Sequence, residues 1–307
     1  MSPVPWLSYL ALAAAMAIVG AYVGFSKALV FVFPILVLAW LRFAIAAVVM
    51  APWLRRPAGE AALDRRSHRL LFLESFFGNF LFSICMLFGI ARSSALAAGV
   101  IMAAIPAVVA VFSWLLLGER IGARVGAGIA CAMAGIALVA LARDGEGELA
   151  SGSLVGSVLL LGAVACESLY VVIGKKLTAD VGPKRISALI NLWGLVLMTP
   201  FAIWQWPSFA YAFIPMSSWV LLVVYAIAAS VLTVWLWMTG MKHVPAASAG
   251  VFTVFLPVAA AAVGILVFGE TFNAVQLAAF ALALAGVLLA AFPGRRASSA
   301  SAMRSPP

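Results

Sequence analysis

The chain alternates between long apolar runs and short polar segments. Ten runs of about 20 predominantly apolar residues follow one another, and an α-helix of that length crosses the hydrocarbon core of a bilayer, which is roughly 30 Å thick. None of the runs shows the alternation of apolar and polar residues that a membrane β-barrel requires. The pattern therefore predicts an all-α polytopic membrane protein with ten transmembrane helices. The expected spans are residues 6–29, 34–53, 70–91, 94–117, 121–142, 154–177, 186–205, 217–240, 245–268 and 273–292.

Composition agrees with a membrane location. Hydrophobic residues make up 66% of the 307 residues and charged residues 9%, with a mean hydropathy of +1.17. These values exclude a water-soluble domain of ordinary composition. The first apolar run starts at Trp6 without a basic flank and is longer than the apolar core of a cleaved signal peptide. We therefore expect it to be retained as a membrane span.

The three cysteines, Cys85, Cys131 and Cys166, lie within apolar runs and share no CxxC-like spacing. Their odd number and their positions argue against a disulfide framework and against a metal site. The sequence also contains no glycine-rich phosphate-binding loop that would hold ATP. We therefore expect neither a metal nor another cofactor.

The formal net charge of +9 is explained by topology. If the N-terminus is cytoplasmic, fifteen of the 19 lysines and arginines fall in cytoplasmic segments. Lys27, Arg92 and Arg143 fall on the other side, and Arg42 lies within a span. Such an excess of basic residues is typical of cytoplasmic loops. We therefore expect both termini in the cytoplasm, and we assign the basic charge to orientation rather than to binding of nucleic acid.

The chain divides into two halves of five spans each, residues 1–142 and 154–292. Between them lies the acidic, Gly-rich segment "RDGEGELASGS", residues 143–153, which we expect to be an extracytoplasmic linker. The tail, residues 293–307, is rich in small residues and ends in two prolines. We expect this tail to be disordered in the cytoplasm.

The sequence contains an internal repeat of one apolar segment. A shift of 151 residues aligns "AAGVIMAAIPAVVAVFSWLLLGER", which begins at Ala97, with "SAGVFTVFLPVAAAAVGILVFGET", which begins at Ser248, so that a glycine, a proline and a Gly-Glu pair coincide. Each half has an odd number of spans, so the two halves enter the membrane in opposite orientations. This predicts two inverted five-helix repeats around a central cavity, an arrangement suited to alternating access.

Pro106 and Pro257 occupy equivalent places in these two helices. A proline in a helix interior removes one backbone hydrogen bond and costs about 3 kcal/mol. The cost is tolerable where the freed carbonyl meets a neighbour, a water or a substrate. We expect paired bends that act as hinges beside the cavity. The alternative is a static kink, because proline is common in membrane helices.

The ten-span plan, the two stretches with their "GE" pairs and the "LRF" of residues 41–43 resemble the drug/metabolite transporter superfamily, in its EamA-like ten-helix exporter branch. The resemblance covers about residues 6–292. It implies a basket of two inverted repeats whose cavity is lined by the first, third, fourth, sixth, eighth and ninth spans. Within the branch, the sequence is most similar to bacterial exporters of amino acids, including aromatic ones. The resemblance therefore implies an inner-membrane exporter of amino acids or similar small metabolites, with other small metabolites or cationic drugs as the alternative.

Glu167 is the candidate for binding an ammonium group. It lies more than halfway along the sixth span, and Ala163, Tyr170 and Gly174 share its helix face at spacings of three and four residues. An acid beside a phenol can receive an ammonium group and stack an apolar or aromatic side chain. The alternative is a carboxyl group that hydrogen-bonds a neighbouring helix.

The third span carries a polar stripe at steps of four residues, Ser75, Asn79 and Ser83. We expect the stripe to face a wet cavity, with Asn79 and Ser83 contacting the substrate. The alternative is that these side chains join neighbouring helices through hydrogen bonds. Glu74, near the cytoplasmic end of the same span, is expected at the membrane interface.

On the eighth span, Ser230, Thr233, Trp237 and Gly240 share a face. Trp237 is the aromatic residue that we expect nearest the substrate, with an interfacial belt position as the alternative. Thr253, one turn before Pro257, is expected to offer a hydroxyl group near the bend.

Four further polar residues are predicted to be structural. Arg42 lies roughly 12 Å along the second span, which the resemblance places outside the cavity, so an ion pair or snorkelling to the surface is expected there rather than substrate binding. Asn191 occupies the comparable place in the seventh span, and Glu119 and Glu270 close their helices at the membrane surface. No lysine or arginine is then left on a cavity face. We therefore expect Asn79 and backbone N–H groups near the helix breaks to bind the carboxylate of a zwitterionic substrate.

Catalysis and passive conduction are the competing functions. Intramembrane enzymes require paired Asp residues, His clusters or Ser-His arrangements within the spans. All three aspartates, Asp64, Asp144 and Asp180, are in expected loops, as is His68, and His243 lies at a span end. A channel does not require two inverted halves with paired bends. The sequence therefore predicts a transporter rather than an enzyme, whose partners are a small-molecule substrate and the lipid bilayer, and it leaves open whether export is coupled to protons.

Overall fold

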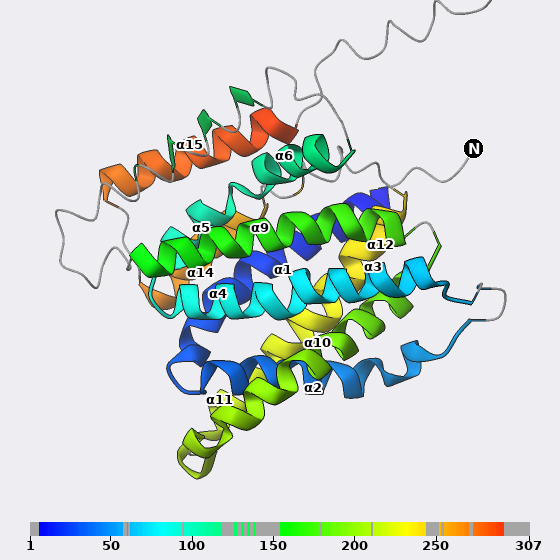
Figure 1. Cartoon of the computed structure of the whole chain (residues 1–307). Coiled ribbons are helices and arrows are strands. Elements are labelled where there is room, and N and C mark those ends of the chain that lie inside the picture. Colours follow the sequence, from blue (N-terminus) through cyan, green and yellow to red (C-terminus); the bar gives the residue numbers. More distant parts are fainter. Residues whose placement is uncertain are drawn as a thin grey trace, which may run out of the picture.

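The computed structural model describes residues 6–57, 60, 62–93, 95–117, 154–178, 180–209, 211–243, 252, 255–269 and 273–291, with a few positions between 126 and 138. In this part of the chain every regular element is helical and no strand occurs (Figure 1). Six helices are long and apolar enough to cross a membrane. The other expected spans are represented by shorter apolar helices or lie outside the described residues.

The six long helices correspond to the first, second, third, sixth, seventh and eighth expected spans. They are α1 (Trp6–Val30); α2 (Ile35–Met50) continued by the 3-10 turn η1 (Ala51–Leu54); α3 (Arg65–Ser75), η2 (Phe76–Leu81) and α4 (Phe82–Ile90) in one line; α9 (Leu154–Leu177); α10 (Pro183–Gln205), followed by the 3-10 turn η4 (Trp206–Ser208); and α11 (Met216–Ala226), η6 (Ile227–Leu232) and α12 (Thr233–His243) in one line. The shorter elements are η5 (Tyr211–Phe213), α5 (Ala95–Met102), α6 (Ile105–Leu117), α14 (Phe255–Phe268) and α15 (Ala274–Ala291).

The distribution of side chains is the reverse of that in a soluble protein. Large apolar side chains are exposed on the periphery, as at Phe213, which is 89% exposed, and Leu266, which is 82% exposed. Polar side chains such as Glu74, Ser75 and Asn191 are fully buried inside the bundle. An apolar exterior of this kind is stable only in contact with lipid, so the arrangement supports the membrane location.

The fourth apolar run does not form one helix with a proline in its middle. α5 ends at Met102 and α6 begins at Ile105, so Pro106 is the second residue of α6. In the first turn of a helix the missing N–H of proline has no intrahelical partner to lose. Pro257 is likewise the third residue of α14. The expectation that Pro106 lies inside one continuous helix is therefore wrong, whereas residues 253 and 254, which precede α14, lie outside the described residues.

Two π-helical turns interrupt the third and eighth spans at matching places. η2 covers Phe76–Leu81 and η6 covers Ile227–Leu232, which is the same 151-residue shift that relates the repeated sequences. Steps of four residues drift by about 40° each on an ideal α-helix. A wider turn cancels this drift, which keeps a stripe with four-residue spacing on one face.

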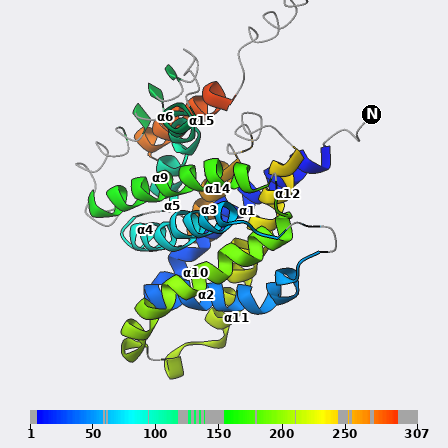
Figure 2. The same ribbon diagram turned by 45° about the vertical axis from the view of Figure 1, so that its right-hand side comes forward.

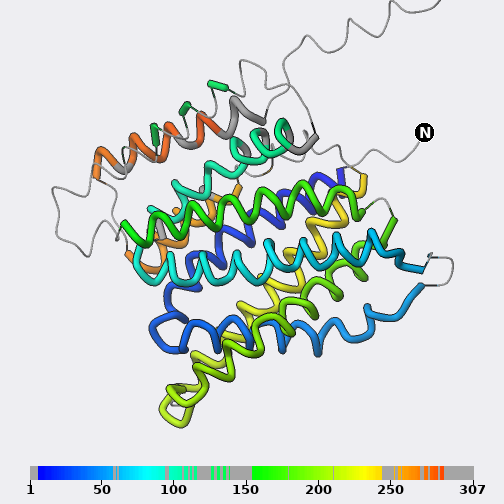
Figure 3. The backbone as a smooth tube through the Cα atoms, in the orientation of Figure 1, coloured from blue at the N-terminus to red at the C-terminus, as the bar shows by residue number. Residues whose placement is uncertain are grey.

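α1 runs through the middle of the bundle, packed mainly against α14 and α12 (Figures 1 and 3). α10 packs on α2, and α4 packs on α9. Turned by 45°, the molecule shows α6 and α15 next to each other at one edge (Figure 2). Helices from the two halves of the sequence thus alternate in the interior, and the space between α1, α2, α4, α9 and α12 is formed by both halves.

Helix ends follow ordinary capping rules. Asp64 caps α3 by accepting a hydrogen bond of 2.7 Å from the Ser67 backbone N–H, and hydrogen bonds from Ser67 lower the pKa of the Asp64 carboxyl. Gly269 ends α14 with φ +64°, a left-handed conformation that favours glycine. This explains the glycine of the second Gly-Glu pair.

Candidate functional site

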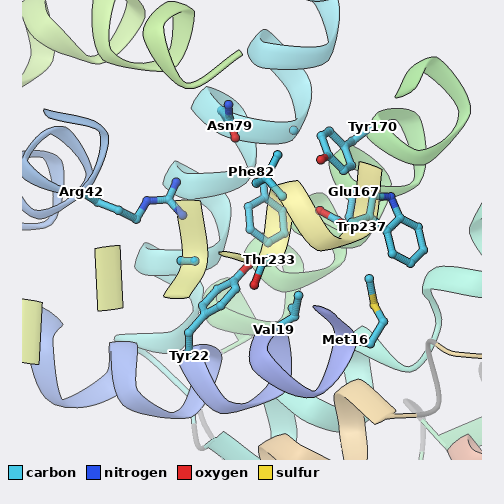
Figure 4. A pocket seen from close by; sticks show the side chains of 13 residues that line it. Met16, Val19, Tyr22, Arg42, Asn79, Phe82, Glu167, Tyr170, Thr233 and Trp237 are labelled. Atoms are coloured by element: carbon cyan, nitrogen blue, oxygen red, sulfur yellow. The ribbon is translucent and has the colours of Figure 1, made fainter. Parts of the chain in front are cut away.

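A narrow cavity lies inside the bundle where α1, α2, the third span, α9 and the eighth span meet (Figure 4). Its empty volume is about 410 Å³, including the part that opens to solvent. Because this volume includes open solvent and the space right up to the lining atoms, it is an upper limit on what the cavity holds in this conformation. The lining combines one arginine, one glutamate, one asparagine and several aromatic residues.

α9 contributes Glu167 and Tyr170, the pair expected from helix periodicity. Tyr170 packs its ring against the backbone of Gly78 in η2, so a side chain at position 78 would occupy the space of the ring. Glu167 has no hydrogen bond or ion pair with any described residue, and its carboxyl group is not sealed from the cavity. A carboxyl group without a hydrogen-bond or ion-pair partner among the described residues therefore faces the cavity next to the phenol of Tyr170.

The third span contributes Asn79, whereas its two serines are occupied by other helices. The Asn79 side-chain amide donates to the Ile190 carbonyl oxygen on α10 over 2.8 Å, and Ser75 donates to the same oxygen over 2.6 Å. Ser83 donates to the Asn79 carbonyl oxygen and does not line the cavity. Asn79 thus lines the cavity, and Ser75 and Asn79 join the third span to α10.

The eighth span contributes Thr233 and Trp237, both on the cavity wall. Trp237 is only 3% exposed, which places it inside the bundle rather than in an interfacial belt. The Thr233 hydroxyl has no hydrogen-bond partner among the described residues. Ser230 uses its backbone carbonyl to accept from Asn191 over 3.0 Å, and Gly240 packs against α1. The cavity thus meets an indole and an unpaired hydroxyl on this side.

Arg42 lines the cavity, where the sequence assigned it to a structural position outside. It is 4% exposed and donates from Nη2 to Ser83 Oγ over 2.6 Å. Its guanidinium carbon lies 4.4 Å from the ring centroid of Phe43 and 5.9 Å from that of Tyr225. Its Nε has no hydrogen-bond partner in the described part of the chain. A positive charge therefore faces the cavity from α2.

Glu74 is a second acidic residue inside the bundle, which the sequence placed at the membrane interface. It is fully buried, and neither carboxylate oxygen has a hydrogen-bond partner among the described residues. It packs against Gly174 of α9, one helical turn beyond Tyr170. The position near the end of an apolar run does not reveal that α9 and α12 cover this side chain.

The resemblance implied that the first span lines the cavity, but the sequence did not identify its lining residues, which are Met16, Val19 and Tyr22. α1 is apolar around its whole circumference, so no periodic signal distinguishes its inner face. Tyr22, a polar residue in an apolar run, was the available hint; it packs edge to face on Tyr225 with ring centroids 5.8 Å apart.

Of the remaining predicted residues, only Asn191 has a described side chain, and it is not among the residues that line the cavity. Asn191 joins α10 to η6 through Ser230 and also donates to the Ser187 carbonyl oxygen over 2.9 Å. Pro106 and Pro257 lie in α6 and α14, with side chains outside the description. Thr253, Glu119 and Glu270 lie outside the described residues, as do the linker 143–153 and the tail 293–307. The described residues contain no group of three His, Cys, Asp or Glu side chains that could hold a metal ion.

A helical membrane bundle with a small polar cavity between its two halves defines a candidate transporter. The chain belongs to the EamA-like transporter family, whose model matches residues 6–141 and again residues 154–292. It is 32% identical over 283 residues to the uncharacterized transporter YetK of Bacillus subtilis (strain 168), covering 92% of this chain and 86% of that protein. One crystal structure of a protein is similar with a TM-score of 0.65 at 18% identity, covering 95% of this chain and 99% of that chain. This last similarity shows a shared fold alone.

The family settles the broad assignment. The protein is a multi-pass membrane protein of a transporter family in the drug/metabolite transporter superfamily. The family model matches each half of the chain separately, in agreement with the repeated sequence.

Proposed function

We propose that this protein is a secondary transporter that exports amino acids or similar small metabolites across the bacterial inner membrane. The observation that carries the proposal is the cavity itself. Both family-matched segments line it, five of the six helices of membrane-spanning length contribute to its wall, and it carries a glutamate, an arginine and aromatic side chains. Charged groups inside an apolar bundle are costly, so their presence beside a cavity favours a role in binding.

The mechanism proposed is alternating access by two inverted repeats of five helices, residues 1–142 and 154–292. The matching π-helical turns support it, because they give the third and eighth spans the same irregularity at the same place. π-helical turns occur often at functional sites. The interruption between α5 and α6 before Pro106 supplies a further place where a helix can change direction, and the repeated sequence relates this place to Pro257. When one repeat adopts the shape of the other, the cavity opens to the opposite side.

Within the cavity, we assign substrate contact to Asn79, Glu167, Tyr170 and Trp237. Glu167 receives an ammonium group, and Tyr170 and Trp237 contact an apolar or aromatic side chain. Ser83 acts through Asn79 and Arg42 rather than by direct contact, because it does not line the cavity. Export of other small metabolites or cationic drugs is the alternative, favoured by the acidic group and the aromatic wall taken alone.

The test is counterflow in proteoliposomes that contain the purified protein. Vesicles are loaded with unlabelled amino acid, and labelled amino acid is added outside. A carrier accumulates label transiently above the equilibrium level, because unlabelled substrate returns the binding site to the outer face. Protein-free vesicles are the control. Uptake that is not accelerated by internal substrate identifies a pore and rejects the carrier mechanism.

The same vesicles, loaded with a pH-sensitive dye, test proton coupling. We propose that Glu167 carries the proton if export is coupled, with buried Glu74 as the second carboxyl to compare. Glu167→Gln is expected to abolish the substrate-dependent pH change inside the vesicles. Glu74→Gln is measured beside it as the matched variant of the other buried carboxyl group. Unchanged export together with unchanged proton movement in Glu167→Gln removes Glu167 from the mechanism.

A further inference from the structure

The cavity contains a positive charge that the proposed function does not use. Arg42 is nine-tenths buried, lies on the cavity wall and leaves its Nε without a hydrogen-bond partner among the described residues. A guanidinium group has five N–H donors; among the described residues the Ser83 hydroxyl accepts from one of them, and the Tyr225 side chain also interacts with the guanidinium. The group therefore retains donors for a further acceptor.

The charge of Arg42 is not neutralised by an acidic side chain of the protein among the described residues. Among the described residues it forms no ion pair with a carboxylate. Its partners are a hydroxyl group and two aromatic rings, Phe43 and Tyr225. These contacts hold the guanidinium in place but leave its charge uncompensated. An arginine in the middle of a membrane span costs about 3 kcal/mol on insertion scales, which favours an anionic ligand as the missing partner.

Glu167 presents the opposite charge across the same cavity. Figure 4 shows the Arg42 guanidinium on one side and Glu167, with Tyr170 and Trp237, on the other. The two groups do not pair with each other, because no ion pair joins them within 4.0 Å. Two opposite charges that face one cavity without touching leave room for a solute that has both charges.

We propose that Arg42 and Glu167 form a dipolar site for a zwitterionic solute, in which Arg42 binds the carboxylate and Glu167 the ammonium group. The inference rests on the proposed transport function and makes its substrate class narrower. Arginine is suited to the role because its fork binds a carboxylate through two parallel hydrogen bonds. The Ser83 hydroxyl accepts a hydrogen bond from Nη2 of Arg42 and so positions the guanidinium group.

The aromatic residues of the cavity wall favour a solute with an apolar or aromatic side chain. Tyr22, Phe82, Tyr170 and Trp237 line the cavity between and around the two charges. An α-amino acid with an apolar or aromatic side chain matches all three features. A cationic drug leaves Arg42 without its partner and places like charges in one small cavity, and a simple carboxylate does the same to Glu167. The dipolar site therefore discriminates against the alternative substrates.

The test compares ligands that differ in one charge. Purified protein in detergent is titrated with L-phenylalanine, with phenethylamine, which lacks the carboxylate, and with 3-phenylpropionate, which lacks the ammonium group; alanine, ethylamine and propionate form a second set. Binding is followed by calorimetry. The wild type is expected to prefer one of the zwitterions over both of its singly charged analogues by about 10- to 100-fold, the range for losing hydrogen bonds to a charged group.

Variants assign each charge to its residue. Arg42→Gln is expected to remove the preference for the zwitterion over the amine and to leave binding of the amine unchanged or stronger. Glu167→Gln is expected to remove the preference over the carboxylate. Arg42→Lys keeps the positive charge and is expected to retain part of the preference for the zwitterion over the amine. It therefore shows whether Arg42→Gln acts through loss of the charge or through loss of the fold.

Two results overturn the dipolar site. One is a wild type that shows no preference for a zwitterion in either ligand set, and the other is a folded Arg42→Gln with an unchanged preference. The wild-type titrations decide the question even if a variant does not fold. Counterflow separates this failure from that of the proposed function, because a protein that exchanges amines or other solutes by counterflow is still a carrier without a dipolar site.

Discussion

At the residue scale, Glu74 and Gly174 are a matched pair. The Glu74 side chain is fully buried, and a Cβ atom at Gly174 would lie 2.6 Å from Glu74 Oε1 and 3.2 Å from Met238 Cε. The absence of a side chain at position 174 therefore makes the space that the carboxyl group fills. α3, α9 and α12 meet at this point.

We expect Gly174→Ala to destabilise the protein by about 1–3 kcal/mol, the usual cost of overpacking. Glu74→Ala in the same chain removes the atom that the new methyl group meets, so the double variant is expected to be more stable than the sum of the two single changes allows. Thermal unfolding in detergent of the wild type, the two single variants and the double variant gives the coupling. Additive effects would show that the carboxyl group does not fill this space.

The residues of the site could be predicted in part because helix periodicity is a local property. Glu167, Tyr170, Asn79 and Trp237 were found as polar or aromatic positions that recur on one face of a helix. Arg42 was assigned a structural role because which helix faces the cavity is a tertiary property.

At the scale of elements, the contact of α1 with α14 depends on two glycines four residues apart. A Cβ atom at Gly20 would overlap the Leu256 carbonyl oxygen and lie 2.8 Å from the Ala259 side chain. A Cβ atom at Gly24 would lie 2.5 Å from Val263. Glycines at this spacing let two membrane helices approach closely, and here they join the first span to α14, the helix that contains Pro257.

Gly20→Ala is expected to lower stability by about 1–3 kcal/mol, because backbone atoms of α14 must shift. Gly126→Ala is the control, since a Cβ atom there meets no atom of the described residues within 4 Å. Unfolding midpoints of both variants, measured in the same detergent, give the comparison. A Gly20→Ala midpoint no lower than that of Gly126→Ala would contradict the close contact.

The helical elements could be predicted from apolar length, but their irregularities could not. α1, α2, α9 and α10 begin and end within a few residues of the expected spans. η2 and η6 were missed because a single π-helical turn has no compositional signature. In retrospect, four-residue steps at Ser75, Asn79 and Ser83 and at Ala229, Thr233 and Trp237 are the trace that such turns leave.

At the scale of the whole molecule, the proposed mechanism depends on orientation. Two halves of five spans place residues 2 and 299 on one side of the membrane and residue 151 on the other, whereas halves with an even number of spans place all three together. The excess of basic residues assigns the first side to the cytoplasm. Helices of membrane-spanning length are described for six of the ten expected spans, so orientation has to be measured.

Three single-cysteine variants measure it in a chain whose native cysteines, Cys85, Cys131 and Cys166, are replaced by alanine. Ser151→Cys is expected to react with a membrane-impermeant maleimide in intact cells, because the linker is extracytoplasmic. Ser2→Cys and Ser299→Cys are expected to react only after permeabilisation. Labelling of all three from the same side would mean that the halves are not inverted, and exchange of shape between them could then no longer carry the cavity from one face of the membrane to the other.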